Sequence, residues 1–291
     1  MGFYAQGDER AAGGSLVLAC VVMSNPLATP LPWELSAKDY AEVTAPFFQK
    51  FAEVALDRAV VTAGTRVLDV AAGPGTLALL AAERGCRTTA VDFSPNMIDE
   101  LRSSAARRGV AVDTHVADGQ ALPMADACFD AAFSMFGLMF FPDRARGLRE
   151  TFRVLVPGGV AVISSWQPMD RFPFLCDIFA ALCELLPDLP FGGGKEVLAT
   201  LDEIVEEMRG AGFEAIEVHE VSASVEAPTL DEAWTFMSRG SPPLALLRKN
   251  IGDEAWHKVE QGIVATLRRK HGQGPQKLTM NANLGIGRKP L

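Results

Sequence analysis

The chain has 291 residues, of which 48% are hydrophobic and 22% are charged, so it can bury a sizeable core in one large domain or two small ones. Its net charge of −9 argues against a nucleic-acid partner, because phosphate binding needs a basic surface. Five cysteines and four histidines are scattered without metal-ligand spacing, which predicts neither a metal site nor a disulfide framework.

The N-terminal segment, residues 1–32, is predicted to be an extension of uncertain order. Its apolar run at 16–23 is too short to span a bilayer. Acidic Asp8 and Glu9 precede this run, where a secretion signal would carry positive charge. We therefore expect a cytoplasmic protein without a membrane span, folded over residues 33–291.

The first half of the chain alternates between two hydrophobic periods. Helical spacing runs from Ser36 to about Leu56, and Pro46 should interrupt or kink that helix. Apolar strands and helices then alternate, which predicts a parallel sheet with helices on both faces. The expected strands are 66–70, 87–92, 111–116, 129–135 and 160–165, and the expected helices are 76–84, 95–108 and 144–155.

The second half is less regular. Helices are expected at 174–186 and 201–208, and strands at 213–225 and 277–286. A helical insert at about 226–272 separates the two strands, and such an insert serves equally well as a lid or as a homodimer surface. The predicted fold is therefore a doubly wound, mostly parallel, seven-stranded Rossmann-like α/β sheet with an antiparallel edge and a helical lid inserted late in the chain.

Three acids follow the first three strands. Asp69 and Asp92 close the first and second strands, and Asp118 follows the third. Ligands of such sheets bind at the carboxyl ends of the strands, so we expect these acids to line one site. Between the first two, Gly73 and Gly75 let the backbone approach a ligand, because they carry no side chain.

The glycine loop is compatible with two nucleoside ligands. Gly73-x-Gly75-x-x-Ala78 matches a dinucleotide fingerprint, with Asp92 at about the right distance for a ribose. A pyrophosphate would, however, be repelled by the carboxylate of Asp69 beside the loop. S-Adenosylmethionine carries an ammonium group and no phosphate, so Asp69 favours it, while an NAD-dependent oxidoreductase remains the alternative.

Five segments in register then resemble the class I S-adenosylmethionine-dependent methyltransferases, in particular the group similar to ubiquinone/menaquinone C-methyltransferases and their small-molecule relatives. The resemblance covers roughly residues 60–166 and departs from the fullest glycine pattern at Ala71, where the family has Gly. The matching segments are 67–75, 90–97, 117–123, 129–134 and 155–159.

The resemblance implies where S-adenosylmethionine would lie. Four positions of the glycine loop line its methionine end, Asp92 holds its ribose, and five residues surround its adenine. Ser134 and Met135 approach the methionine amine and the transferring methyl, and Tyr40 covers the cofactor. The methionine-end residues are Asp69, Ala71, Gly73 and Gly75, and the adenine residues are Phe93, Met97, Asp118, Gly119 and Gln120.

The implied activity is in-line transfer of a methyl group to a small-molecule acceptor, which the protein binds, orients and shields from water. Residues 136–141, Trp166, Gln167 and Arg171 are candidates for the acceptor side. The Asn-Pro-Pro-aromatic motif of many amino-methylating enzymes is absent after the fourth strand, which disfavours adenine or glutamine acceptors. No residue is assigned as a catalytic base, and a non-catalytic S-adenosylmethionine-binding protein is a further alternative.

Overall fold

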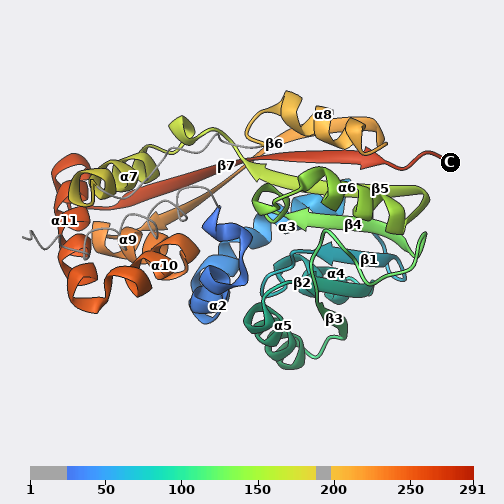
Figure 1. Cartoon of the computed structure of the whole chain (residues 1–291), viewed down its shortest axis with the longest axis horizontal. Helices are drawn as coiled ribbons and strands as arrows, with labels where there is room; N and C mark the ends of the chain where they lie inside the picture. The colour runs from blue at the N-terminus through green and yellow to red at the C-terminus, as the bar shows by residue number, and fades with distance from the viewer. Residues whose placement is uncertain (1–24, 188–197) are drawn as a thin grey trace, which may run out of the picture.

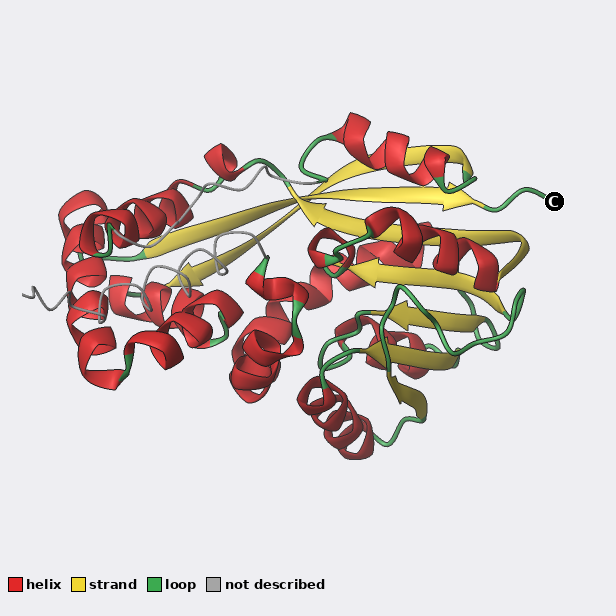
Figure 2. Cartoon of the chain, viewed as in Figure 1, coloured by secondary structure: helices red, strands yellow, loops and turns green. Residues whose placement is uncertain are grey.

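The computed structural model describes residues 25–187 and 198–291 as one seven-stranded sheet with helices on both faces (Figures 1 and 2). The strand order is β3-β2-β1-β4-β5-β7-β6. The first five strands pair in parallel, and β7 is antiparallel to both β5 and β6. The strands are β1 Arg66–Val70, β2 Arg87–Asp92, β3 Val112–Val116, β4 Phe129–Met135, β5 Leu155–Trp166, β6 Glu214–Ala227 and β7 Gln276–Arg288.

The alternation of side chains along the parallel strands produces two cores. On one face, Val67 and Phe133 pack with α3 Ala45–Arg58 and α4 Thr76–Glu83. On the other face, Leu68 packs with α6 Arg144–Val154 and α8 Leu201–Gly210. Helix α5, Pro95–Arg108, is capped by Ser94, whose side chain accepts a hydrogen bond from the Met97 N–H. The predicted doubly wound sheet with an antiparallel edge is confirmed.

The last two strands carry the helical insert away from the parallel sheet. Strand β5 ends its pairing at Trp166 opposite Ala282, whereas β6 and β7 remain paired as far as Ala227 and Gln276. Figure 1 shows α7, α9, α10 and α11 gathered around this extended two-stranded arm. Helices α9 Leu230–Arg239, α10 Pro242–Ile251 and α11 Asp253–His271 lie between the two last strands, as expected, whereas α7 Pro173–Leu185 lies between β5 and β6.

The N-terminal helical region differs from the prediction. It begins at Pro30 rather than Ser36, and the Ser36 hydroxyl donates to the Pro32 carbonyl from within α2, Pro30–Asp39, instead of capping the helix. The expected disturbance near Pro46 is a π-helical segment, η2 Tyr40–Thr44, placed directly before α3. Because proline has no N–H to donate, the turn ahead of it is free to widen.

Smaller differences concern the element ends and the predicted extension. Strand β5 begins at Leu155 rather than at residue 160, and its register with β4 shifts near its start. Residues 25–32 are part of the fold, with η1 at Pro26–Ala28 and the first turn of α2, whereas residues 1–24 of the predicted extension lie outside the described residues. No helix in the described ranges is both long enough and apolar enough to cross a bilayer.

The glycine loop ends at a position where a side chain would meet the neighbouring helix. Gly75 has φ +87°, and a Cβ there would lie 2.5 Å from Leu101 Cγ of α5. Gly64 has the same φ of +87° but has nothing within 4 Å of its Cβ position. The two glycines therefore share a backbone constraint and differ in packing.

We expect Gly75→Ala to destabilise the protein more than Gly64→Ala. Both substitutions place a side chain in the left-handed region, at about 1–2 kcal/mol each. Only Gly75→Ala overlaps Leu101, which adds about 1–3 kcal/mol. Urea unfolding of both variants measures the difference, and equal losses would show that α5 yields to the added methyl group.

Candidate cofactor site

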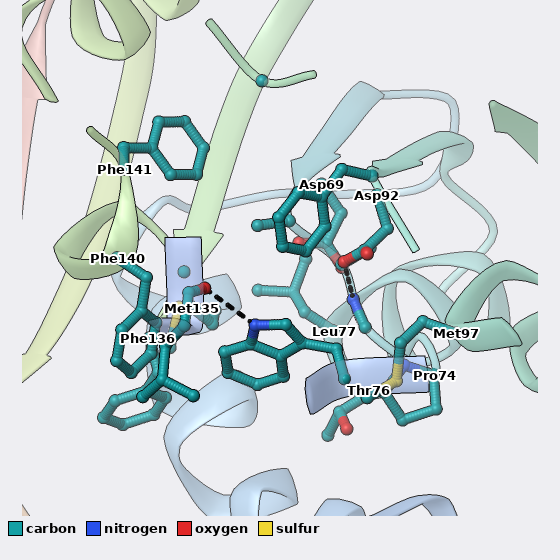
Figure 3. Close-up of a pocket in the computed structure, with 18 of the residues that line it drawn as sticks. Asp69, Pro74, Thr76, Leu77, Asp92, Met97, Met135, Phe136, Phe140 and Phe141 are labelled. Atoms are coloured by element: carbon teal, nitrogen blue, oxygen red, sulfur yellow. Dashed lines mark hydrogen bonds between the residues drawn. The ribbon is translucent and has the colours of Figure 1, made fainter. Parts of the chain in front are cut away.

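A cavity of about 250 Å³ lies at the carboxyl ends of β1, β2 and β4. Figure 3 shows Asp69 and Asp92 together on one side of it, with Phe136, Phe140 and Phe141 opposite Pro74, Thr76 and Met97. Such a cavity, mostly apolar with a few convergent polar groups, is typical of a small-molecule site.

Asp92 is the organising residue of this cavity. It is only 5% exposed. One carboxylate oxygen accepts from the Gly73 N–H at 2.8 Å, and the other accepts from the Ser94 N–H at 2.9 Å. Each oxygen has two lone pairs, so both keep acceptor capacity toward the cavity. Burial raises the pKa of Asp92 to about 6, although the two N–H donors oppose that shift.

Asp69 lies beside Asp92 and is engaged differently. Its Oδ2 accepts from the Ala78 N–H at 3.0 Å, so its carboxyl group faces the first turn of α4. Burial raises the pKa of Asp69 to about 8, and the nearby charge of Asp92 adds to the rise. Two neighbouring buried carboxyl groups favour a ligand that brings positive charge or hydrogen-bond donors.

The residues that the sequence predicts around the adenine also line this cavity. Met97 is buried and Phe93 is half-buried, and both line the cavity. Asp118 is exposed and accepts hydrogen bonds from the backbone and side-chain amides of Gln120. The Gln120 Oε1 accepts in turn from the Asp143 N–H at 2.8 Å, which holds the loop after β3.

Tyr40, the residue predicted to cover the cofactor, lies in η2 and lines the same cavity. Its ring stacks on Phe48 with a centroid separation of 5.9 Å. Desolvation raises the pKa of the Tyr40 phenol above its ordinary value of 10, and the charge of Asp92 raises it further. The phenol is therefore a neutral hydrogen-bonding group at physiological pH.

Two of the residues predicted to contact the cofactor do not line the cavity. Gly75 packs against Leu101, as described above, because its loop turns away into α4. Ser134 is buried in β4, and its Oγ has no hydrogen-bond partner among the described residues. The predicted residues that do line the cavity are Tyr40, Asp69, Ala71, Gly73, Asp92, Phe93, Met97, Asp118, Gly119, Gln120 and Met135.

The sequence prediction missed the contribution of the N-terminal segment. Leu27, Ala28 and Trp33 line the cavity. The Trp33 indole N–H donates to the Leu27 carbonyl at 2.9 Å, and its ring meets Phe140 edge-on at 5.2 Å. The one signal that pointed to this segment was its content of Trp and Leu, which is unusual for a disordered extension.

The two strand ends facing the cavity carry strained backbone. Ala71 after β1 has φ +56°, and Phe136 after β4 has φ +59°. Left-handed conformations of residues other than glycine are unfavourable and concentrate at functional sites. Gly137 follows Phe136, and a Cβ at this position would lie 2.4 Å from the Ala71 Cβ.

We expect Gly137→Ala to lower stability by about 1–3 kcal/mol through this overlap. The double variant Ala71→Gly/Gly137→Ala should recover most of the loss, because the next neighbour, Ser134 Oγ, is 3.3 Å away. Chemical denaturation of wild type, both single variants and the double variant checks this. A double variant as unstable as Gly137→Ala would show that the Ala71 methyl group is not the obstacle.

Comparisons with known proteins agree with this geometry. The model of a methyltransferase domain matches residues 68–163. Over 122 residues the chain is 40% identical to demethylmenaquinone methyltransferase of Thermus thermophilus, covering 41% of this chain and 56% of that protein. Over 134 residues it is 36% identical to an uncharacterised protein of Mycobacterium tuberculosis, covering 46% and 48%. The chain thus spans about half the length of these curated relatives.

Solved structures extend the likeness of fold to most of the chain. A putative methyltransferase from Bacillus halodurans aligns with a TM-score of 0.57 at 18% identity, covering 83% of this chain and all of that one (100%). The cyclase SpnF aligns with a TM-score of 0.53 at 24% identity, covering 84% and 82%. In sequence, the similarity to a methyltransferase domain extends over residues 68–163 of this chain.

Proposed function

We propose that this protein binds S-adenosylmethionine and transfers its methyl group to a small-molecule acceptor. The observation that carries the proposal is the Asp92 carboxylate, buried at the end of β2 and held by two backbone N–H groups. In this position, its remaining lone pairs suit the paired hydroxyls of a ribose. Asp69 beside it suits the ammonium group of the methionine moiety.

The remaining lining supports the same ligand. Met97 and Phe93 offer apolar and aromatic surface to an adenine ring, and the Asp118 carboxylate suits its exocyclic amine. Ala71 and Gly73 present backbone close to the methionine end. The cofactor supplies a methyl group activated on sulfonium, so the protein's own tasks are to bind, orient and exclude water.

The structure disfavours the dinucleotide alternative. A pyrophosphate would need the free N–H groups at the start of α4. The Asp69 carboxyl group already accepts from one of them, that of Ala78, so this donor is not available to a phosphate. The non-catalytic alternative has no observation of its own in its favour, whereas the aromatic wall formed by Tyr40, Phe48 and Phe136 is suited to excluding water from the methyl group.

The first test is calorimetric titration with S-adenosylhomocysteine, beside NAD. We expect Asp92→Asn to weaken binding about 10- to 100-fold, the loss typical of a charged hydrogen bond of roughly 1.5–3 kcal/mol. Asp113→Asn, on the exposed part of neighbouring β3, is the matched control and should leave binding unchanged. Binding of NAD without binding of S-adenosylhomocysteine would refute the proposal.

The binding should depend on pH through Asp92. Ribose hydroxyls donate to the carboxylate form, so binding lowers the pKa from about 6 in the free protein. Ionisation of Asp92 should therefore raise the affinity for S-adenosylhomocysteine by up to about tenfold per pH unit below 6. Asp92→Asn should remove this contribution and leave only the pH dependence carried by Asp69, whose pKa is about 8. An unchanged slope between pH 5 and pH 6 in Asp92→Asn would refute the role of Asp92.

A further inference from the structure

A separate cavity of about 570 Å³ lies between helix α2 and three helices of the insert, α9, α10 and α11. We call it the insert cavity. Figure 1 shows α10 beside α2, in agreement with their contacts. No described residue lines both this cavity and the proposed cofactor cavity, so the two are distinct sites. The apolar and aromatic lining residues are Leu35, Trp234, Leu244, Ala245 and Trp256.

Two buried indole rings supply the aromatic part of this lining. Trp234 of α9 is 5% exposed and Trp256 of α11 is 6% exposed. The described residues show no ring contact between these two indoles, so neither ring covers the face of the other. Tryptophan presents the aromatic face that attracts a positive charge most strongly. The insert cavity therefore holds two side chains suited to an organic cation.

Glu260 of α11 adds a carboxylate beside these rings. It is half-buried and lines the cavity, and its Oε1 accepts from the Trp234 indole N–H at 3.1 Å. Its Oε2 has no hydrogen-bond partner among the described residues. A half-buried carboxylate oxygen without a donor favours a ligand that brings positive charge and N–H groups.

The two arginines of the lining are already engaged by carboxylates. The Arg239 guanidinium bonds Asp39 at 2.7 Å and Glu42 at 2.6 Å. The Arg248 guanidinium bonds Asp253 at 2.7 Å. Because each guanidinium has its own acidic partner, neither is available to neutralise Glu260, and the repulsion of a cationic ligand by either is reduced.

The charge around the cavity is negative by one. The ionisable lining residues are Asp39, Arg239, Arg248, Lys249, Asp253 and Glu260. Lys249 is exposed and has no ion pair among the described residues. With Glu42, the second partner of Arg239, four carboxylates surround three cations. This excess complements a ligand that carries a single positive charge.

We propose that the insert cavity binds a small organic ammonium compound, a monocation with an apolar or aromatic body, whose charge lies against Glu260 and the indoles of Trp234 and Trp256. A carboxylate and the faces of aromatic rings both attract an ammonium group, and the apolar lining accepts the rest of the molecule. Because this cavity is separate from the proposed cofactor cavity, the compound is an additional ligand of the protein and not the methyl acceptor.

The test is calorimetric titration of the full chain with three probes that share a phenyl ring and differ in charge. These probes are phenethylammonium, neutral 2-phenylethanol and anionic 3-phenylpropanoate. We expect phenethylammonium to bind most tightly and the anion most weakly. The affinity for phenethylammonium should be the same with and without S-adenosylhomocysteine, because the two cavities share no lining residue.

Two variants assign the binding to the insert cavity. Glu260→Gln removes the charge but keeps an oxygen that can accept from the Trp234 indole. It should weaken phenethylammonium about tenfold or more and change 2-phenylethanol by less than about twofold. Trp256→Leu keeps an apolar side chain but removes a ring, so it should weaken phenethylammonium more than 2-phenylethanol. An unfolding midpoint of Glu260→Gln close to that of the wild type would show that the fold is intact.

Glu254→Gln is the matched control. Glu254 is an exposed carboxylate of the same helix that bonds Lys258 and does not line the cavity. Its replacement should leave every affinity unchanged. The inference would be overturned by an absence of phenethylammonium binding or by tighter binding of the neutral or the anionic probe. It would also be overturned if S-adenosylhomocysteine displaced phenethylammonium, or if Glu260→Gln left its affinity unchanged.

Discussion

The site depends on one buried carboxylate. Asp92 ends β2, yet its oxygens hold the Gly73 N–H of the loop after β1 and the Ser94 N–H at the start of α5. A single side chain thus ties together the ends of two parallel strands and the entry to a helix. Without these two donors, a carboxylate that is 5% exposed would be very unfavourable, and without the carboxylate the two N–H groups would lack their partner.

A second buried carboxyl group, that of Asp69, lines the same cavity. Asp69 is buried against the start of α4, where the helix dipole and the Ala78 N–H favour negative charge. Burial nevertheless raises the pKa of both groups, to about 8 for Asp69 and about 6 for Asp92. Near neutral pH the pair in the free protein therefore carries less than its full negative charge. A ligand that supplies an ammonium group and hydroxyl donors would stabilise the fully ionised form.

The aromatic wall has its own structural cause. Pro46 cannot donate a backbone hydrogen bond, and the chain before it widens into the π-helical η2, which carries Tyr40. Across from it, Phe136 is kept in a left-handed conformation while its N–H donates to Ser164 Oγ and its ring stacks on Trp166. Strained backbone on one side and an irregular helix on the other place the rings of Tyr40 and Phe136 against the cofactor cavity.

Much of the site could be read from local sequence. Asp69, Gly73 and Asp92 occupy strand ends and a turn whose geometry is decided by a few neighbouring residues, and parallel pairing must bring such ends to one edge. The capping of α5 by Ser94 is equally local. These features were predicted correctly because hydrophobic period, turn chemistry and strand order all point to the same arrangement.

Tertiary structure decided the rest. Whether Gly75 faces a ligand or Leu101 depends on how closely α5 approaches, and neither the loop nor the helix encodes that distance alone. Trp33 and Leu27 reach the cavity because α2 packs on α5 and η1 meets α10, contacts between segments far apart in the chain. Phe236 lies about two hundred residues from Tyr40 and shares a cavity with it through the close contact at Gly240. Sequence period determines which face of an element is buried, whereas only packing determines what that face meets.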